Sequence, residues 1–155
     1  MNTKISRRAL LLAAATMPLA SLAQPARKVP VEVWKDPSCG CCKEWVTHLE
    51  QNGFSVTVND TGNAAVRARL GIPQNLGSCH TAVVGGYAIE GHVPAREIQR
   101  LLKEKPAAIG LSVPGMPVGG PGMDGPSYRG RRDPYDVLLV LKGGGVRAYA
   151  SYNKA

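Results

Sequence analysis

The four cysteines carry the most distinctive chemistry of this 155-residue sequence. Three crowd into the run Cys39-Gly40-Cys41-Cys42, and the fourth, Cys79, lies far along the chain. Cys39 and Cys42 have the Cys-x-x-Cys spacing of redox-active dithiols, in which a helix N-terminus lowers the thiol pKa. Neighbouring cysteines can bridge each other only through a strained ring, which disfavours two separate structural disulfides. The cluster is therefore suited to thiol reactivity or to metal binding.

Two histidines are candidate partners of these thiols. His80 follows Cys79 directly, so a fold that brings Cys79 to the cluster also brings His80 close. His92 lies in Glu90-Gly91-His92-Val93-Pro94, on a predicted turn before the last predicted helix. The third histidine, His48, falls near the middle of a predicted helix, and we assign it to solvent or to packing.

The spacing of the cysteines favours copper over zinc. Residues three apart on a helix share a face, whereas neighbours diverge by about 100°, so we expect Cys39 and Cys42 to converge and Cys41 to point elsewhere. Closed zinc sites take paired ligands from two knuckles, a spacing that this sequence lacks. Soft thiolates prefer monovalent copper, and one sulfur can bridge two such ions. We predict a Cu(I) site with one or several ions, and its candidate ligands are Cys39, Cys41, Cys42, Cys79, His80 and His92.

Two methionines in a Gly/Pro-rich stretch offer further sulfur. The thioethers of Met116 and Met123 can also bind monovalent copper, so this stretch would be able to fold over the cluster. Packing of a long loop by these side chains is the simpler interpretation, and we favour it.

The elements that must position these residues alternate between strand and helix. Hydrophobic periodicity predicts strands at 31–34, 54–58, 81–84 and 87–89, and helices over 41–52, 63–70 and 94–105. Residues 106–134 show no periodicity, and a final hairpin is predicted at 137–141 and 146–149. This β-α-β-α-β-β-α order, with Cys-x-x-Cys at the start of the first helix, is that of thioredoxin-like folds. We therefore predict a thioredoxin-like α/β core with a long Gly/Pro/Met loop and an added C-terminal hairpin.

One departure from the thioredoxin-like pattern bears on the chemistry. Those folds carry a Pro-Thr pair before the hairpin, whereas this sequence has Cys79-His80-Thr81 there. Two residue types that bind metals replace the proline that contacts peptides, which argues against simple disulfide exchange.

The first 23 residues have the anatomy of an export signal. Lys4, Arg7 and Arg8 precede an apolar run, and Ser21-Leu22-Ala23 forms the small-residue end after which we expect cleavage. The paired arginines allow a Sec or a twin-arginine route. The apolar run is too short to remain as a membrane span, so no stable membrane insertion is expected. Residues 24–155 then form a single domain.

Charge gives no support for a nucleic-acid partner. The formal charge of +8 falls to +5 without the three basic residues of the predicted signal. Arg129, Arg131 and Arg132 cluster, but no aromatic residues interleave with them to stack on bases. A solvated basic loop explains them.

Several motifs, in order, resemble the CopG-type copper-resistance proteins. They lie at Asp36–Trp45, Ser78–Val84, Glu90–Pro94, Val113–Pro117 and Pro121–Met123, and the resemblance spans residues 29–152. It implies a periplasmic thioredoxin-like domain that holds a cysteine-bridged copper cluster and serves copper tolerance, and it leaves a role in copper redox open. The ligands that the resemblance carries over are Cys39, Cys41, Cys42, Cys79 and, less directly, His80.

These observations predict an exported copper-binding protein that captures Cu(I) and contributes to periplasmic copper resistance. Copper ions and other periplasmic copper-handling proteins are the expected partners, and we favour a metal-binding protein over an enzyme. Three alternatives stay open: a thiol-disulfide oxidoreductase using Cys39 and Cys42, a copper redox enzyme, and a binding module stapled by disulfides.

Overall fold

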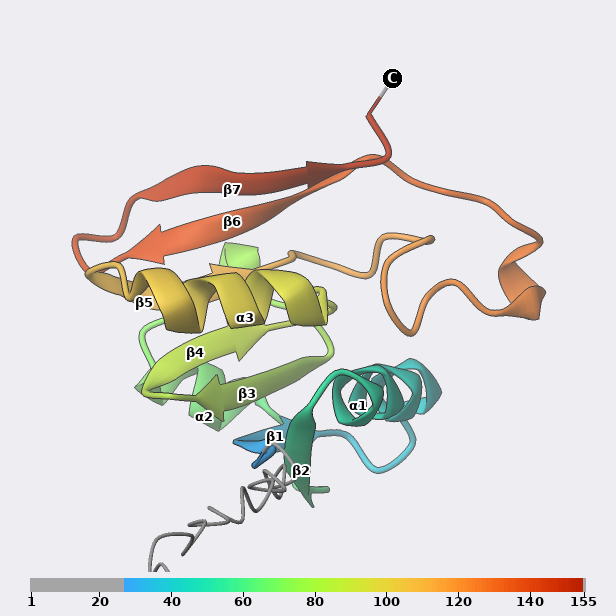
Figure 1. Ribbon diagram of the computed structural model, residues 1–155, viewed down its shortest axis with the longest axis horizontal. Coiled ribbons are helices and arrows are strands. Elements are labelled where there is room, and N and C mark those ends of the chain that lie inside the picture. The colour runs from blue at the N-terminus through green and yellow to red at the C-terminus, as the bar shows by residue number, and fades with distance from the viewer. Residues whose placement is uncertain (1–26, 155) are drawn as a thin grey trace, which may run out of the picture.

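The computed structural model describes residues 27–154, which form a mixed α/β fold around one seven-stranded sheet (Figure 1). The strand order is β2-β1-β3-β4-β5-β6-β7. The strands are β1 (Val29–Lys35), β2 (Phe54–Asn59), β3 (His80–Val84), β4 (Tyr87–Glu90), β5 (Ala108–Ser112), β6 (Tyr135–Leu141) and β7 (Val146–Tyr152). The helices are α1 (Gly40–Gln51), α2 (Ala64–Arg69) and α3 (Ala95–Glu104).

The pairing of β1 brings the two cysteine segments to one end of the sheet. β1 lies parallel to β2, and α1 connects the two. On its other side β1 pairs antiparallel with β3, in a register that sets Lys35 opposite His80. The last residue of β1 therefore lies beside the first residue of β3. Because the first turn of α1 follows β1 closely and Cys79 immediately precedes β3, both segments meet there.

Helices cover both faces of the sheet and enclose two unequal cores. α1 and α3 lie in front of the sheet in Figure 1, and α2 lies behind it. The larger core holds Trp45 and Leu49 of α1 and Ile98 and Leu101 of α3, packed on the strands. The smaller core lies on the opposite face, where its members are Ile72, Leu76, Ala88 and Val140. Burial of the α1 side chains in the larger core, worth about 1.5–3 kcal/mol for a leucine, fixes α1 against the sheet.

Most predicted elements lie close to their observed positions. Alternation succeeds for β1, β2 and the β3–β4 hairpin, whose turn uses Gly85 and Gly86 at φ 54° and 84°. Such positive φ values at both central positions suit the two-residue hairpin turn that the sequence predicts.

The prediction that residues 106–134 lack regular structure is wrong for β5. This strand pairs parallel with β4 and antiparallel with β6, so the last two strands continue the sheet and are more than an added hairpin. The sheet is thus larger than expected. The sequence of β5, Ala-Ile-Gly-Leu-Ser, is short and is mostly buried, so it shows no alternation between apolar and polar residues.

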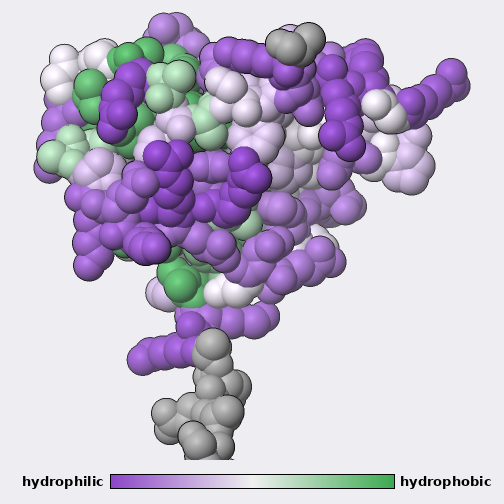
Figure 2. Space-filling view, turned by 45° about the horizontal axis from the view of Figure 1, so that its top comes forward, coloured by the Kyte–Doolittle hydropathy of each residue, from purple (hydrophilic) through white to green (hydrophobic). Residues whose placement is uncertain are grey.

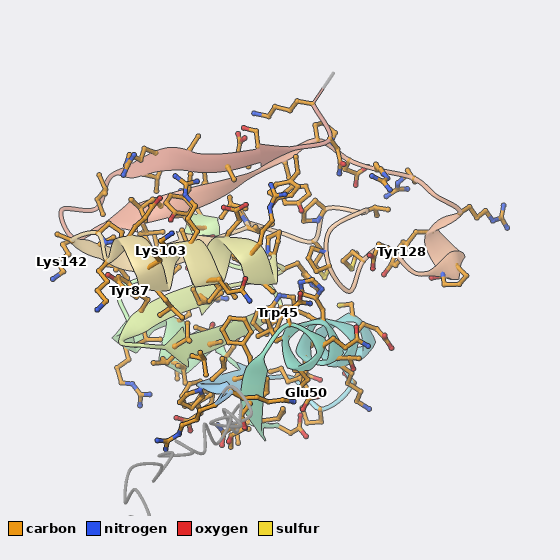
Figure 3. All side chains as sticks on the ribbon, in the orientation of Figure 1. Trp45, Glu50, Tyr87, Lys103, Tyr128 and Lys142 are labelled. Atoms are coloured by element: carbon orange, nitrogen blue, oxygen red, sulfur yellow. A yellow bond between two sulfur atoms is a disulfide. The ribbon has the colours of Figure 1, made fainter. Side chains whose placement is uncertain are left out.

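Residues 113–134 of that segment form a long loop, with one 3₁₀ turn at Pro126–Tyr128, that packs on the start of α1. A Cβ atom on Gly122 would lie 2.7 Å from the Cys41 carbonyl oxygen and 2.8 Å from the Trp45 nitrogen. Only glycine permits this approach, since Gly122 also has φ 80°. Figure 3 shows Trp45 between α1 and the central strands, and Tyr128 on the loop beyond the end of the sheet.

The face shown in Figure 2 is largely hydrophilic, with a group of hydrophobic residues toward its upper left. No helix within residues 27–154 combines the length and apolar content needed to cross a membrane. The predicted export signal, residues 1–23, lies outside the described residues.

The close approach of β4 and β5 gives a testable prediction. A Cβ atom on Gly110 would lie 1.7 Å from the Ala88 carbonyl oxygen. We expect Gly110→Ala to lower the free energy of unfolding by about 1–3 kcal/mol or more, because the two strands must separate. Urea denaturation measures this. Gly143→Ala is the control, since nothing lies within 4 Å of its added Cβ atom. Equal stability of the two variants would contradict the strand pairing.

Candidate metal centre

A tight turn places three cysteines at the start of α1. The Asp36 carboxylate accepts a hydrogen bond from the Ser38 amide at 2.9 Å, and the Cys39 amide donates to the Asp36 carbonyl oxygen at 3.1 Å. Cys39 is the extended residue before the helix, and Cys41 and Cys42 lie in its first turn. The free amides and the positive dipole end of this turn stabilise negative charge on the sulfurs.

The four cysteine sulfurs form one cluster, within 4.8 Å of one another. Cys39 and Cys42 are joined in a disulfide, which confirms that they converge. The expectation that Cys41 points elsewhere is wrong, because its Sγ lies 3.5 Å from that of Cys39 and 4.0 Å from that of Cys79. The helical 100° step does not relate Cys39 to Cys41, since Cys39 has the extended dihedrals φ −71° and ψ 98°.

A buried carboxylate holds the segment that carries Cys79. Glu90, fully buried in β4, accepts hydrogen bonds from the Ser78 amide at 2.7 Å and the Thr81 hydroxyl at 2.6 Å. Arg67 of α2 pairs with the same carboxylate at 3.2 Å and also donates to the Ser78 carbonyl oxygen. The backbone on both sides of Cys79 and His80 is thereby fixed. The sequence does not mark Glu90 or Arg67 as site residues, because one carboxylate in a short strand and one arginine on a short helix carry no motif.

Both candidate histidines face the Cys79 sulfur. The His92 Nε2 atom lies 3.2 Å from it, and the His80 Nδ1 atom lies 3.4 Å from it. His92 donates its Nδ1 proton to the Pro121 carbonyl oxygen at 2.8 Å, which leaves Nε2 free to bind a metal. The His80 ring is fully buried against Trp45, with ring centroids 4.3 Å apart. Its Nε2 atom is buried without a hydrogen-bond partner among residues 27–154.

Burial sets the protonation of these groups. It lowers the pKa of His92, and it lowers the pKa of His80 well below its usual value with a further contribution from His92. Both rings are therefore neutral at pH 7 and able to act as ligands. Burial, and secondly the neighbouring Cys41, raises the pKa of Cys79 to about 12. A metal ion that binds Cys79 must displace its proton.

The sulfur cluster has dimensions that suit a metal ion. With metal–sulfur bonds of about 2.3 Å, two sulfurs on one ion lie about 3.8 Å apart in tetrahedral geometry and about 4.6 Å apart in linear geometry. The Cys41–Cys79 separation of 4.0 Å falls within this range. Thiolate sulfur favours soft monovalent ions. All four sulfurs become ligands only after the Cys39–Cys42 disulfide is reduced.

The remaining sequence candidates divide between packing and access. His48 accepts a hydrogen bond from the Ala95 amide at 3.1 Å, at the start of α3, in keeping with a packing role. Met123 is buried and accepts from the Tyr128 hydroxyl, as expected of a residue that anchors the loop. Met116 is 53% exposed and shares a pocket of about 410 Å³ with Cys79. A second pocket, of about 400 Å³, opens beside Cys41.

Comparisons with known proteins converge on one family. A protein family described as "Protein of unknown function, DUF411" matches residues 76–123. Two solved structures, titled "Copper resistance protein copG" Form 1 and Form 2, are each 44% identical to this chain. Form 1 has a TM-score of 0.75 and covers 82% of this chain and 99% of its own; Form 2 has 0.74, 81% and 98%. No curated protein matches significantly.

The buried Glu90–Arg67 pair gives a second prediction. We expect Glu90→Ala to lower the free energy of unfolding by about 3–5 kcal/mol, because it leaves a largely buried guanidinium and the Ser78 amide without their carboxylate. Thermal or urea denaturation measures the loss. Glu50→Ala is the matched control on the exposed side of α1 (Figure 3), where a change within about 0.5 kcal/mol is expected. A loss at Glu90 no larger than at Glu50 would show that the carboxylate does not hold this segment.

Proposed function

Because the chain belongs to the family of CopG copper resistance proteins, we propose that it captures monovalent copper as cargo in its four-cysteine cluster. The observation that carries the proposal is the convergence of four sulfurs from two distant segments within 4.8 Å. Four thiolates at a helix N-terminus form a soft and anionic donor set, which prefers Cu(I) to the harder divalent ions.

Copper capture requires two chemical changes at the cluster. Reduction of the Cys39–Cys42 disulfide by a dithiol takes up two electrons and two protons and yields two thiols, while the reductant becomes a disulfide. Binding of Cu(I) then displaces thiol protons to solvent. Because the thiolate charges offset those of the bound ions, several Cu(I) ions bridged by shared sulfurs suit the cluster as well as one.

We further propose that the protein acts in the periplasm, after an export signal at residues 1–23 is removed. The basic, apolar and small-residue parts of that segment support this.

A thioredoxin-like core is part of the proposal, and the β2-β1-β3-β4 order with α1 starting at the cysteines supports it. The pockets beside Cys41 and Cys79 offer routes by which other copper-handling proteins would reach the ions.

A thiol-disulfide oxidoreductase is the second candidate function. The Cys39–Cys42 disulfide at the N-terminus of α1 favours it, because this is the position of a redox-active dithiol. The two functions need different residues. Disulfide exchange uses Cys39 and Cys42 alone, whereas copper capture also uses Cys41 and Cys79.

Copper titration tests the first function. We expect the reduced, full-length protein to bind Cu(I) in competition with a chromophoric chelator, and Cys79→Ser to weaken binding by at least about tenfold, since a soft ligand is lost. His48→Gln is the control, because His48 accepts a hydrogen bond from the Ala95 amide and belongs to neither group of converging donors. Fully reduced protein with four free thiols that retains no Cu(I) would rule the function out.

Insulin reduction separates the second function from the first. We expect little turnover by the wild-type protein with a dithiol donor, because Cys79 and His80 stand where thioredoxin-like folds carry the proline that contacts peptides. Turnover that is substantial and survives in both Cys41→Ser and Cys79→Ser would identify an oxidoreductase instead. In that case the cluster geometry would be incidental to a dithiol mechanism.

A further inference from the structure

The closed disulfide changes which metal ligands remain at this end of the sheet. With Cys39 and Cys42 joined, Cys41 and Cys79 are the two free thiols of the sequence. Cys79 alone of these belongs to a second group of converging donors, in which its sulfur and one ring nitrogen each of His80 and His92 lie within 4.8 Å of one another. The two groups share only Cys79.

This second group has the dimensions of a metal site. With a metal–sulfur bond of about 2.3 Å and metal–nitrogen bonds of about 2.0–2.1 Å, sulfur and nitrogen ligands on one ion lie about 3.3–3.6 Å apart at angles near tetrahedral. The observed separations from the Cys79 sulfur are 3.4 Å to His80 and 3.2 Å to His92. Very little movement is needed to receive an ion.

The surroundings orient both rings as ligands. His92 is held by the hydrogen bond from its Nδ1 to the Pro121 carbonyl oxygen, the contact that fixes a metal-binding imidazole through its other nitrogen. His80 is held by tilted ring contact with Trp45 and by edge contact with His92, with the two imidazole centroids 4.9 Å apart. Both rings are fully buried, so they are ordered before an ion arrives.

We propose that the disulfide form of this protein holds one divalent ion at Cys79, His80 and His92, a site distinct from the thiolate cluster of the reduced form. One thiolate and two neutral imidazoles are a donor set of intermediate softness, which suits a divalent ion such as Zn²⁺ or Cu²⁺. The Cys41 sulfur lies 4.0 Å from the Cys79 sulfur and a pocket opens beside Cys79, so the Cys41 thiolate or a water molecule could supply a fourth ligand.

The disulfide therefore selects the metal. Reduction of the disulfide supplies two further thiolates and favours several soft monovalent ions. Oxidation of the two thiols by a disulfide of higher potential removes two protons and two electrons from them. It leaves the single mixed site of Cys79, His80 and His92. The inference extends the proposed copper capture to the oxidised protein and rests on it for its biological setting. Its chemistry depends only on Cys79 and the two histidines, so the two proposals can fail separately.

Titration of the oxidised, full-length protein tests the inference. After confirming by mass that Cys39 and Cys42 are joined and that two thiols are free, Zn²⁺ is titrated against a chromophoric chelator and Co²⁺ is followed by absorption. Both ions are redox-inert toward the thiols under anaerobic conditions. We expect one equivalent of either ion, and a cobalt spectrum with tetrahedral ligand-field bands and sulfur-to-cobalt charge transfer.

Histidine variants identify the site. We expect His92→Ala to weaken Zn²⁺ binding by more than the roughly 10–100-fold that loss of an outer-shell partner costs. His48→Gln is the matched control, because His48 is the third histidine of the chain and contacts α3 instead. His80→Gln is examined alongside, with circular dichroism to confirm folding, and its expected effect is a shifted cobalt spectrum and weaker binding.

The outcomes separate the two proposals. Any one of three results would overturn the second site. They are no one-equivalent binding by the oxidised wild type, a cobalt spectrum without sulfur charge transfer, and equal Zn²⁺ affinity of His92→Ala and His48→Gln. Cu(I) titration of the reduced wild type supplies the other arm: Cu(I) capture there, together with Zn²⁺ binding by the oxidised wild type that His92→Ala loses, supports both proposals. Failure of Cu(I) capture by reduced wild type, with Zn²⁺ still bound by the oxidised form, overturns the copper function and leaves the mixed site standing.

Discussion

The antiparallel pairing of β1 with β3 is the constraint on which the candidate metal centre depends. Its register sets Lys35 opposite His80, so the residue that starts β3 lies beside the turn that starts α1. Cys79 reaches the other three sulfurs only because of this register. A slip of one residue in this register would turn each side chain of the segment to the other face of the sheet. Cys79 and His80 would then point away from the donors that they now meet.

Polar contacts then convert this proximity into a fixed geometry. Glu90 binds the backbone on one side of Cys79 and the Thr81 side chain on the other, and Arg67 reinforces it. The long loop contributes from the opposite direction, since Gly122 packs on the first turn of α1 and Pro121 orients His92. Segments from both faces of the sheet therefore hold one small group of donors, as preorganised metal sites require.

The same two cysteines limit what the centre can do at any one time. Joined in a disulfide, Cys39 and Cys42 are withdrawn from metal binding; as thiolates, they complete a soft donor set. The proposed copper capture and thiol redox chemistry would thus compete for these two sulfurs, whereas Cys79, His80 and His92 converge without either of them. The buried and neutral imidazoles make this remaining group harder than the sulfur cluster, so the proposed mixed site would couple metal preference to the state of the disulfide.

The sequence by itself determined the local elements and the candidate donors. Alternation and helical spacing are local properties, so they predicted most strands, the three helices and the glycine turn at Gly85 and Gly86, and motif order indicated the family. It failed at β5, a short, mostly buried strand whose pairing is visible only beside β4 and β6. Tertiary structure alone decided that Cys41 converges on Cys79 and that Glu90, Arg67 and Pro121 support the site. Those contacts join residues far apart in sequence, and their energies depend on burial and direction, which no local pattern encodes.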